Sequence, residues 1–230
     1  MYLERQILLI GEENQQKISD LRVCIFGIGG VGSYVFESLI RNGVKNILVC
    51  DKDVIDETNI NRQLLAYIDT IGKPKVDVAY TRAKNISKDI TVIPKYVKVD
   101  ANVSEIISDF NPTYIVDAVD DIQAKLEIVS YAKQNNIKVI SSMGAGNRVK
   151  PWDVCICDIF KTENCPLAKK FRKELRKNNI DSFDVVYSKE IPIKSSTVTS
   201  LMEVVATFGI YIAGYILNDV MYNYKGDKNA

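Results

Sequence analysis

A glycine-rich hexapeptide constrains the fold of this chain more than any other part of its sequence. Gly27-Ile28-Gly29-Gly30-Val31-Gly32 follows the apolar residues 21–26 and opens segment 31–41, where apolar residues recur at helical spacing. A strand, a GxGxxG turn and a helix in this order form the phosphate-binding unit of many α/β proteins. The sequence therefore predicts a nucleotide site on a parallel sheet.

The glycines of this motif have separate expected roles. Gly27 permits the tight turn, Gly29 lets the backbone approach a phosphate, and Gly32 lets the helix pack closely on the strand. The first N–H groups of the helix are then free to bind an anion. Asp51 ends the next strand, 24 residues after Gly27, where its carboxylate can accept hydrogen bonds from ribose hydroxyls. Taken alone, the motif favours an NAD-dependent dehydrogenase.

Strand and helix patterns alternate through the first 142 residues. This alternation predicts an α/β fold with a Rossmann-like, doubly wound, mostly parallel sheet that is covered on both faces. Strands are expected at residues 21–26, 46–50, 91–97, 114–119 and 137–141. Helices are expected at residues 31–41, 73–87, 103–110 and 122–135.

The chain changes character after Gly144-Ala145-Gly146. We expect a smaller C-terminal extension, with short strands at 154–160 and 183–188, a basic helix between them and an apolar helix at 196–217. The polar tail 224–230 is expected to be frayed. A length of 230 residues suits a single domain, with residues 1–146 binding the nucleotide and residues 147–230 serving substrate binding and dimerisation.

The composition excludes several kinds of chemistry. The chain contains no histidine, so Ser-His-Asp groups, Cys-His pairs and imidazole metal sites are ruled out. Of its five cysteines, Cys155 and Cys157 lack the second pair that a structural zinc site needs, and no zinc is expected. Cys24 and Cys50 lie in predicted strands and are interpreted as buried, reduced thiols.

Two features bear on the compartment. The start Met1-Tyr2-Leu3-Glu4-Arg5 lacks the apolar region of a secretory signal, which favours a cytoplasmic protein. The most apolar stretch, residues 204–218, is shorter than the roughly 20 residues that span a bilayer. It is interpreted as a buried core or dimer-interface helix without a stable membrane partner, and a segment that dips into a membrane is the alternative.

Polar residues downstream of Asp51 change the expected nucleotide. A dinucleotide site has little use for them, whereas a triphosphate does. Arg62 and Lys75 can neutralise phosphate charge, and Asp120, at the carboxyl end of a strand, can hold Mg²⁺. The full set is Asp53, Asn59-Ile60-Asn61-Arg62-Gln63, Gly72-Lys73-Pro74-Lys75 and Asp117-Ala118-Val119-Asp120.

This combination resembles the ubiquitin-activating-enzyme-like superfamily, which includes the ThiF, MoeB and HesA proteins. The resemblance implies adenylation of a carboxylate with ATP and Mg²⁺. It also implies a homodimer in which Arg5 reaches the partner's ATP site and acts with Arg62, Lys75 and Asp120. The resembling residues are Glu4-Arg5-Gln6, 27–33, Asp51-x-Asp53, Asn59-x-x-Arg62-Gln63, Lys75 and Asp117-x-x-Asp120. Nucleotide or metal contacts are implied for Gly29, Gly30, Asp51, Asp53, Asn59, Arg62, Gln63, Lys75 and Asp120.

The second half resembles the tRNA threonylcarbamoyladenosine dehydratase branch of this superfamily. That branch closes the threonylcarbamoyl group on an adenosine beside the anticodon into a ring, losing water and consuming ATP. The resemblance leaves open whether the carboxylate becomes an adenylate or an acyl phosphate. The resembling segments are Ser142-Met143-Gly144-Ala145-Gly146, Lys161-Thr162, Pro166-Leu167-Ala168 with the basic helix, and Val185-Val186-Tyr187-Ser188-Lys189-Glu190.

Charge in the second half is compatible with a tRNA partner. Residues 148–177 contain nine Lys or Arg against four Asp or Glu, a net charge of +5. Several of these cations fall on one predicted helix and can contact a phosphate backbone, although an ordinary solvated helix has the same pattern. The candidates are Lys169, Lys170, Arg172, Lys173, Arg176 and Lys177.

Two other functions remain as alternatives. An adenylating enzyme for a ubiquitin-like sulfur-carrier protein shares the ATP constellation, but such enzymes usually carry paired zinc cysteines and often a reactive cysteine. A nicotinamide-binding dehydrogenase or regulatory module shares the glycine motif alone.

Overall fold

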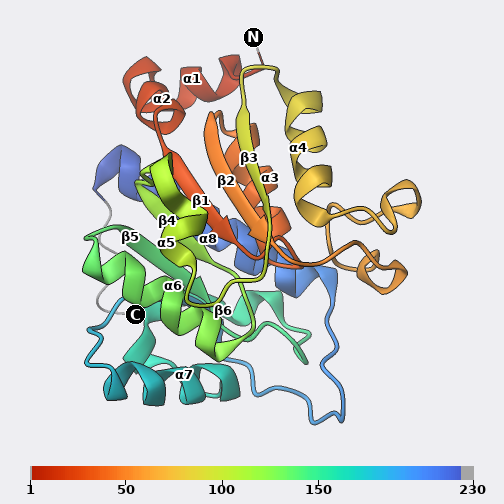
Figure 1. Cartoon of the computed structure of the whole chain (residues 1–230), viewed down its shortest axis with the longest axis vertical. Helices are drawn as coiled ribbons and strands as arrows, with labels where there is room; N and C mark the ends of the chain where they lie inside the picture. Colours follow the sequence, from red (N-terminus) through yellow and green to blue (C-terminus); the bar gives the residue numbers. More distant parts are fainter. Residues whose placement is uncertain (1, 224–230) are drawn as a thin grey trace.

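A seven-stranded sheet runs through the centre of the protein (Figure 1). The computed structural model describes residues 2–223, so the tail predicted to be frayed, residues 224–230, lies outside the described residues. The strand order is β3-β2-β1-β4-β5-β7-β6, and neighbours are parallel except β6, which is antiparallel to β7. The strands are β1 (Arg22–Phe26), β2 (Asn46–Asp51), β3 (Thr91–Tyr96), β4 (Tyr114–Asp117), β5 (Lys138–Ser142), β6 (Val154–Asp158) and β7 (Asp184–Ser188).

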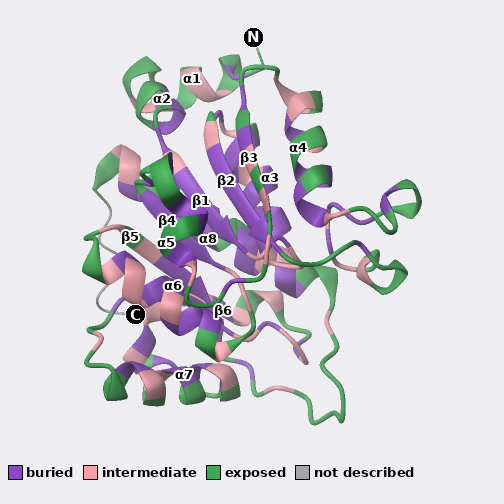
Figure 2. Cartoon of the chain, viewed as in Figure 1, coloured by how far each residue is buried: buried purple, intermediate pink, exposed green. Residues whose placement is uncertain are grey.

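Helices cover both faces of the sheet. α3, α4 and α8 share one hydrophobic core with the sheet, whereas α5 and α6 pack on the other face and α7 packs against α6 beside β7. The buried strands between these layers are visible in Figure 2. The helices are α1 (Glu4–Ile10), α2 (Glu12–Ser19), α3 (Gly32–Arg41), α4 (Lys75–Ile86), α5 (Val103–Ile107), α6 (Ile122–Gln134), α7 (Pro166–Lys177) and α8 (Met202–Tyr222). Short 3₁₀ turns span Glu57–Asn59, Ile68–Thr70, Ser108–Phe110, Pro151–Asp153 and Ile159–Lys161.

Strand β1 explains why the sheet must be covered on both sides. Its side chains alternate between faces, as the two-residue period of a strand requires. Val23 and Ile25 belong to the core under α3 and α8, whereas Cys24 and Phe26 belong to the core under α5 and α6. An unbroken apolar run is the sequence pattern of such a doubly buried parallel strand.

The predicted doubly wound, mostly parallel sheet is confirmed, and the short strands of the C-terminal extension join it. β7 pairs in parallel with β5, and β6 closes that edge. The last helix begins at Met202 instead of residue 196. Asn147 binds the backbone of Thr199 on both sides. Asn147 N donates to the Thr199 carbonyl at 2.7 Å, and Thr199 N donates to Asn147 Oδ1 at 2.7 Å. Because these backbone groups are already bonded, Thr199 cannot join the helix.

Helix α8 is a core helix, although it is longer than the apolar stretch 204–218. Its 21 residues are long and apolar enough to cross a membrane, so the length argument made from residues 204–218 is wrong. Half of its most apolar window is buried, however, and Gly209 packs so closely on α3 that a Cβ there would lie 2.6 Å from Tyr34 Cβ. Packing, and not length, therefore supports the interpretation as a core helix.

Two short helices precede β1, where no element is predicted. α1 buries none of its residues, and α2 is mostly polar, so neither has the apolar periodicity from which a helix is recognised. Gly11, at a φ of 82°, separates them. Tertiary contacts hold them: the side chains of Gln6 and Gln15 both donate to the carbonyl of Asn42 at the end of α3.

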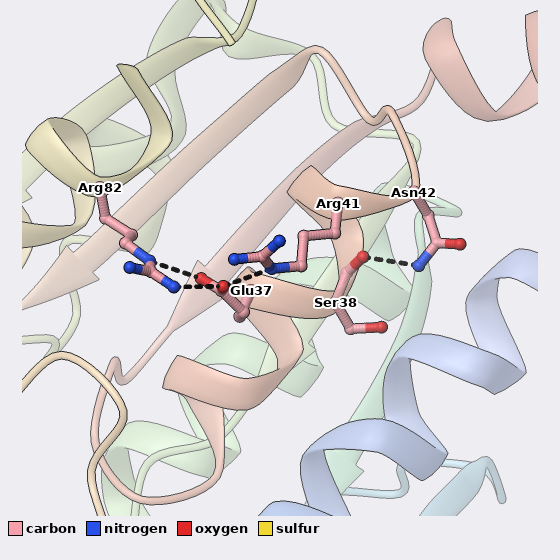
Figure 3. A network of polar contacts seen from close by, with 5 residues as sticks. All are labelled: Glu37, Ser38, Arg41, Asn42 and Arg82. Atoms are coloured by element: carbon pink, nitrogen blue, oxygen red, sulfur yellow. Dashed lines mark hydrogen bonds and ion pairs between the residues drawn. The ribbon is translucent and has the colours of Figure 1, made fainter. Parts of the chain in front are cut away.

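Polar contacts also join α3 to α4 (Figure 3). Glu37 of α3 accepts hydrogen bonds from Arg82 of α4 at 2.7 and 3.0 Å and from Arg41 at 2.5 Å. Burial of Glu37 acts to raise its pKa, but the bonds from the two guanidinium groups outweigh burial and hold the pKa below its usual value. Because α3 begins at the glycine turn and α4 begins at Lys75, this contact fixes two elements that carry candidate site residues.

Candidate functional site

The predicted site residues gather at one edge of the sheet. Parallel strands end at the same edge, and β1 lies between β2 and β4. The glycine turn follows β1, Asp51 ends β2, and the segment containing Asp120 follows β4. From β1 the sheet is built outward in two directions, first to β2 and β3 on one side of β1 and then to β4 and β5 on the other. In open α/β sheets this change of direction is where ligands bind.

The glycine turn has the geometry that its sequence predicts. Gly27 has a φ of 85°, and a Cβ on it would lie 2.7 Å from the carbonyl oxygen of Ala118. A Cβ on Gly32 would overlap the carbonyl oxygen of Gly27. Gly29 is different, because the nearest atom to its virtual Cβ is Gln63 Nε2 at 3.8 Å. Gly27 and Gly32 are thus required by packing, whereas Gly29 leaves open space.

Within the described residues, the amides of Gly29 and Gly30 donate no hydrogen bond to another part of the chain. They lie just before α3, where unpaired N–H groups and the helix dipole attract negative charge. No side chain caps α3. The turn therefore fits a phosphate group.

Asp51 has a structural role in addition to the ribose contact expected of it. Its carboxylate is buried, and one oxygen accepts from Ile28 N at 2.7 Å while the other accepts from Asp53 N at 2.9 Å. It therefore ties the glycine turn to the segment after β2. Each carboxylate oxygen keeps a second acceptor position for a ligand hydroxyl.

Lys75 and Asp53 form an ion pair at the start of α4. Lys75 Nζ lies 3.1 Å from Asp53 Oδ2, and the lysine side chain is nearly buried while the carboxylate is half exposed. Lys75 N also donates to the Asp53 carbonyl at 3.1 Å. The two bonds to Asp53 hold the Lys75 ammonium in one orientation, and an anion bound nearby would compete with Asp53 for it.

Residues 59–63 are held against the start of α3. Leu64 N donates to Ser33 Oγ at 3.2 Å, which positions the buried Gln63 beside Gly29. Asn59 closes the preceding turn by accepting from Asp56 N at 3.3 Å. Arg62 is half-buried, and its Nη1 donates to the Thr58 carbonyl at 2.6 Å and to Asn61 Oδ1 at 3.0 Å. Its charge has no carboxylate partner among residues 2–223.

Asp120 is exposed on the turn after β4, and its carboxylate accepts no hydrogen bond from the described part of the chain. Among the described residues, no three Cys, Asp or Glu side chains lie close enough together to hold a metal ion. Mg²⁺ in nucleotide sites commonly takes one or two carboxylates and completes its shell with phosphates and water. Asp120 therefore fits a metal ligand only where a phosphate is also bound.

Arg5 lies apart from the other predicted residues. It lines a cavity of about 350 Å³ with Asn42, Leu217 and Met221, at the edge where β1 begins. The glycine turn is at the opposite end of α3, and the ten residues of that helix span about 15 Å. The fold thus does not bring Arg5 to the glycine turn of its own chain.

The predicted basic helix is α7, and its cations divide into two groups. Arg172 donates to the carbonyl and hydroxyl of Thr162, and the guanidinium of Arg176 lies 5.1 Å from the centre of the Phe160 ring. Lys177 pairs with Glu174 at 2.8 Å. Lys169, Lys170 and Lys173 are exposed and make no hydrogen bond or ion pair within residues 2–223.

Lys125, the buried partner of Asp117 at this edge, is absent from the predicted site. Lys125 of α6 and Asp117 at the end of β4 are both fully buried, with Nζ and Oδ2 2.9 Å apart. A lysine flanked by Ala124 and Leu126 in an amphipathic helix was the available signal, since lysine is seldom fully buried without a partner.

Four of the cysteines are not activated thiols. All five are free, and Cys24 and Cys50 are buried as expected. Burial raises the pKa of Cys24 and Cys155, and it raises the pKa of Cys50 and Cys157 to about 12. These four thiols stay protonated at neutral pH and are poor nucleophiles.

Comparisons with known proteins point to one family. The ThiF family matches this chain over residues 3–222. The tRNA threonylcarbamoyladenosine dehydratase of Bacillus subtilis is 40% identical over 190 residues, which cover 82% of this chain and 75% of that protein. The Escherichia coli protein of that name is 35% identical over 170 residues, which cover 73% of this chain and 63% of its own length.

Structural similarity extends further. The crystal structure of the E. coli dehydratase TcdA in complex with ATP has a TM-score of 0.90 and 30% identity, covering 96% of this chain and 94% of that one. The sulfur carrier protein ThiS adenylyltransferase of B. subtilis is more distant, at 31% identity over 141 residues, which cover 60% of this chain and 41% of that protein.

Alanine substitution should destabilise the protein at Gly32 but not at Gly29. Gly32→Ala is expected to lower the free energy of unfolding by about 1–3 kcal/mol, because the overlap with Gly27 forces the backbone to shift. Gly29→Ala should change it by less than about 1 kcal/mol, because its surroundings are open. Urea unfolding of both variants measures this difference, and equal losses would contradict the geometry described above.

Proposed function

The chain belongs to the ThiF family, and from that premise we propose that it is an ATP-dependent tRNA-modifying enzyme, a tRNA threonylcarbamoyladenosine dehydratase. The supporting observation is how far the similarity reaches. The B. subtilis relative of that name matches 82% of the chain at 40% identity, and the E. coli dehydratase fold matches 96% of it, so the likeness includes the half beyond the nucleotide motif. The carrier-protein adenylyltransferase matches less of the chain.

ATP is proposed to bind at the carboxyl edge of β1, β2 and β4. The open turn at Gly29 and Gly30 and the start of α3 would take phosphate groups, with Lys75 and Arg62 neutralising their charge. The unpaired charge of Arg62 and the exposed carboxylate of Asp53 make both available to a ligand. Asp120 would supply a carboxylate to Mg²⁺, Asp51 would contact the ribose, and Asn59 and Gln63 would contact the nucleotide, with Gln63 beside the open turn at Gly29.

The residues present suit a reaction in which the substrate supplies its own nucleophile. A carboxylate is a poor electrophile, and ATP supplies a phosphate group that turns the carboxylate oxygen into a leaving group. A neighbouring nucleophilic atom of the same modified adenosine then attacks the activated carbonyl carbon and closes the ring, and the carboxylate oxygen leaves with AMP or phosphate. Intramolecular closures of this kind reach effective molarities of about 10⁵ M or more. This chemistry needs neither an enzyme thiol nor a histidine. Lys75, Arg62 and Arg5 would stabilise the charge that develops on the phosphates.

Helix α7 is proposed to contact the tRNA backbone. Lys169, Lys170 and Lys173 project three unpaired charges from one exposed face, whereas Arg172 and Arg176 are held by Thr162 and Phe160. The three lysines therefore carry the larger share of the proposed contact. The start of α7 packs on Gly144, just beyond the end of β5, which places the helix next to the same edge of the sheet.

A homodimer is proposed to complete each site. Arg5 is about one helix length from the glycine turn of its own chain, so it can act on a nucleotide only in a second copy. Leu8 and Leu9, 82% and 83% exposed on α1, give that end of the molecule an apolar surface that a second copy would cover. A cytoplasmic location accords with a tRNA substrate.

Turnover of modified tRNA is the direct test. Protein incubated with ATP, Mg²⁺ and tRNA carrying threonylcarbamoyladenosine should yield a nucleoside lighter by one water, as measured by mass spectrometry. Lys75→Ala and Asp120→Asn should each lower kcat by about 10²-fold or more, because both act on phosphate charge. Release of AMP or ADP distinguishes an adenylate from an acyl phosphate.

The matched control is Lys88→Ala, an exposed lysine near the start of β3 at the opposite edge of the sheet. It should keep wild-type turnover. Folded wild-type protein that binds ATP but removes no water from the tRNA would refute the proposal. Pyrophosphate exchange that depends on a diglycine-ended carrier protein would instead support the carrier-activating alternative.

Charge reversal on α7 tests the tRNA surface. The triple variant Lys169→Glu, Lys170→Glu and Lys173→Glu should raise KM for tRNA at least about tenfold and leave ATP affinity unchanged, because phosphate contacts dominate nucleic-acid affinity. Kinetics at two salt concentrations should also show a weaker salt dependence. Lys88→Glu is the charge-matched control, and an unaltered tRNA KM in the triple variant would exclude α7 as the contact.

Complementation tests the role of Arg5. Arg5→Ala and Lys75→Ala should each be inactive alone. If Arg5 acts in the partner's site, a mixture in equal amounts should recover about a quarter of wild-type activity, because half of the dimers are mixed and each holds one intact site. A mixture that stays inactive after proven subunit exchange would place Arg5 outside the partner's site.

A further inference from the structure

The buried pair of Asp117 and Lys125 lies directly behind the proposed ATP site. Both side chains are fully buried, and Lys125 Nζ donates to Asp117 Oδ2 at 2.9 Å and to the carbonyl of Ser142 at 2.8 Å. The ammonium also lies 6.0 Å from the centre of the Phe171 ring in α7. One side chain thus contacts the ends of two neighbouring strands and the helix proposed to bind tRNA.

Asp117 links this ammonium to the turn that carries Asp120. It is the last residue of β4, and its Oδ1 accepts from Val119 N at 3.3 Å. Ala118 lies between Asp117 and Val119, and its carbonyl oxygen is so close to Gly27 that a Cβ on Gly27 would clash with it. The carboxylate therefore sets the path of a turn that touches the glycine motif on one side and ends at the proposed metal ligand.

Ser142 links the same ammonium to the substrate half. It is the last residue of β5, and Met143, which follows, donates its N–H to the carbonyl of Val186 in β7 at 2.8 Å. A Cβ on Gly144 would lie 3.5 Å from both Cys165 and Leu167, where α7 begins. The segment after β5 is thus fixed between Lys125 and α7.

Stability alone does not explain this pair. Bringing two charges out of water costs about as much as their attraction returns, and well-packed apolar residues often replace such pairs without loss. A buried pair does hold its partners in one geometry, because breaking it leaves an uncompensated charge. The pair joins the Asp120 turn to the segment after β5. These two segments must keep a fixed separation if a phosphate of ATP is to react with the carboxylate of the modified tRNA.

We propose that Lys125 is a positioning residue that holds the Asp120 turn and the segment after β5 in register, so that the nucleotide and the modified base are aligned. The proposal rests on the dehydratase function given above. It assigns to Lys125 no contact with substrate.

Neutralising both members of the pair separates positioning from stability. Lys125→Met should lower the melting temperature by about 10 °C, because it strands the Asp117 charge. Lys125→Met combined with Asp117→Asn removes that charge and should return to within about 3 °C of wild type. The double variant should still have a kcat at least about tenfold lower, and a higher Mg²⁺ concentration for half-maximal ATP binding, because small misplacements are costly in catalysis.

The ion pair at the other end of β5 is a matched control. Lys138 Nζ and Asp219 Oδ2 lie 2.6 Å apart, and Asp219 is largely buried. Lys138→Met with Asp219→Asn should alter the melting temperature but leave kcat and the Mg²⁺ dependence at wild-type values. Equal kinetic losses in both double variants would overturn the proposal, as would wild-type kinetics in the Asp117 and Lys125 double variant.

A second variant and a second measurement keep the outcome unambiguous. Should the double variant fail to fold, Asp117→Asn alone keeps the acceptor for Val119 and the bond from Lys125 to Ser142, and it should still raise the Mg²⁺ requirement. Calorimetric titration of ATP against Mg²⁺ needs no tRNA. Wild-type protein that yields no dehydrated nucleoside refutes the function, whereas an unchanged Mg²⁺ requirement in both variants refutes the role of Lys125.

Discussion

The close approach of α3 to the end of β1 is the constraint on which the rest of the site depends. Gly32 lies against the carbonyl of Gly27, and Gly27 lies against the carbonyl of Ala118, so three segments meet with no room for a Cβ. This contact sets the start of α3 at the carboxyl ends of β1 and β4. A helix start held in this way offers unpaired N–H groups to a phosphate, and no side chain competes for them.

Acidic residues around the turn serve different purposes. Asp51 uses both carboxylate oxygens to bind backbone amides, and Asp53 orients Lys75, so these two acids organise the site through internal contacts. Asp117 is neutralised in the interior by Lys125. Asp120 alone is exposed without an internal donor in the described chain. Lys75 and Arg62 supply positive charge near the turn and Asp120 keeps a carboxylate without an internal donor, a set of groups that suits the proposed triphosphate better than a dinucleotide.

Local sequence patterns were a good guide where one segment decides its own structure. The apolar run 21–26, followed by glycines, predicted a strand and a tight turn, because a short apolar run suits a buried strand and Gly27 can adopt the positive φ of the turn. The helix at α8 was placed correctly but begins six residues later, because Asn147 captures the backbone of Thr199. Helices α1 and α2 escaped prediction because contacts with Asn42, far along the chain, hold them. The order of β7 and β6 at the sheet edge also depends on pairing between distant segments.

By itself, the sequence determined the glycine turn, the alternating α/β fold and the set of charged residues available to a nucleotide site, since these follow from side-chain type and short-range spacing. The tertiary structure alone decided which of those residues share a site. It separated Arg5 from the glycine turn by the length of α3, divided the cations of α7 into bound and free groups, and buried Lys125 against Asp117. Such outcomes depend on distances between segments far apart in the chain, which packing of the whole core fixes and no local pattern records.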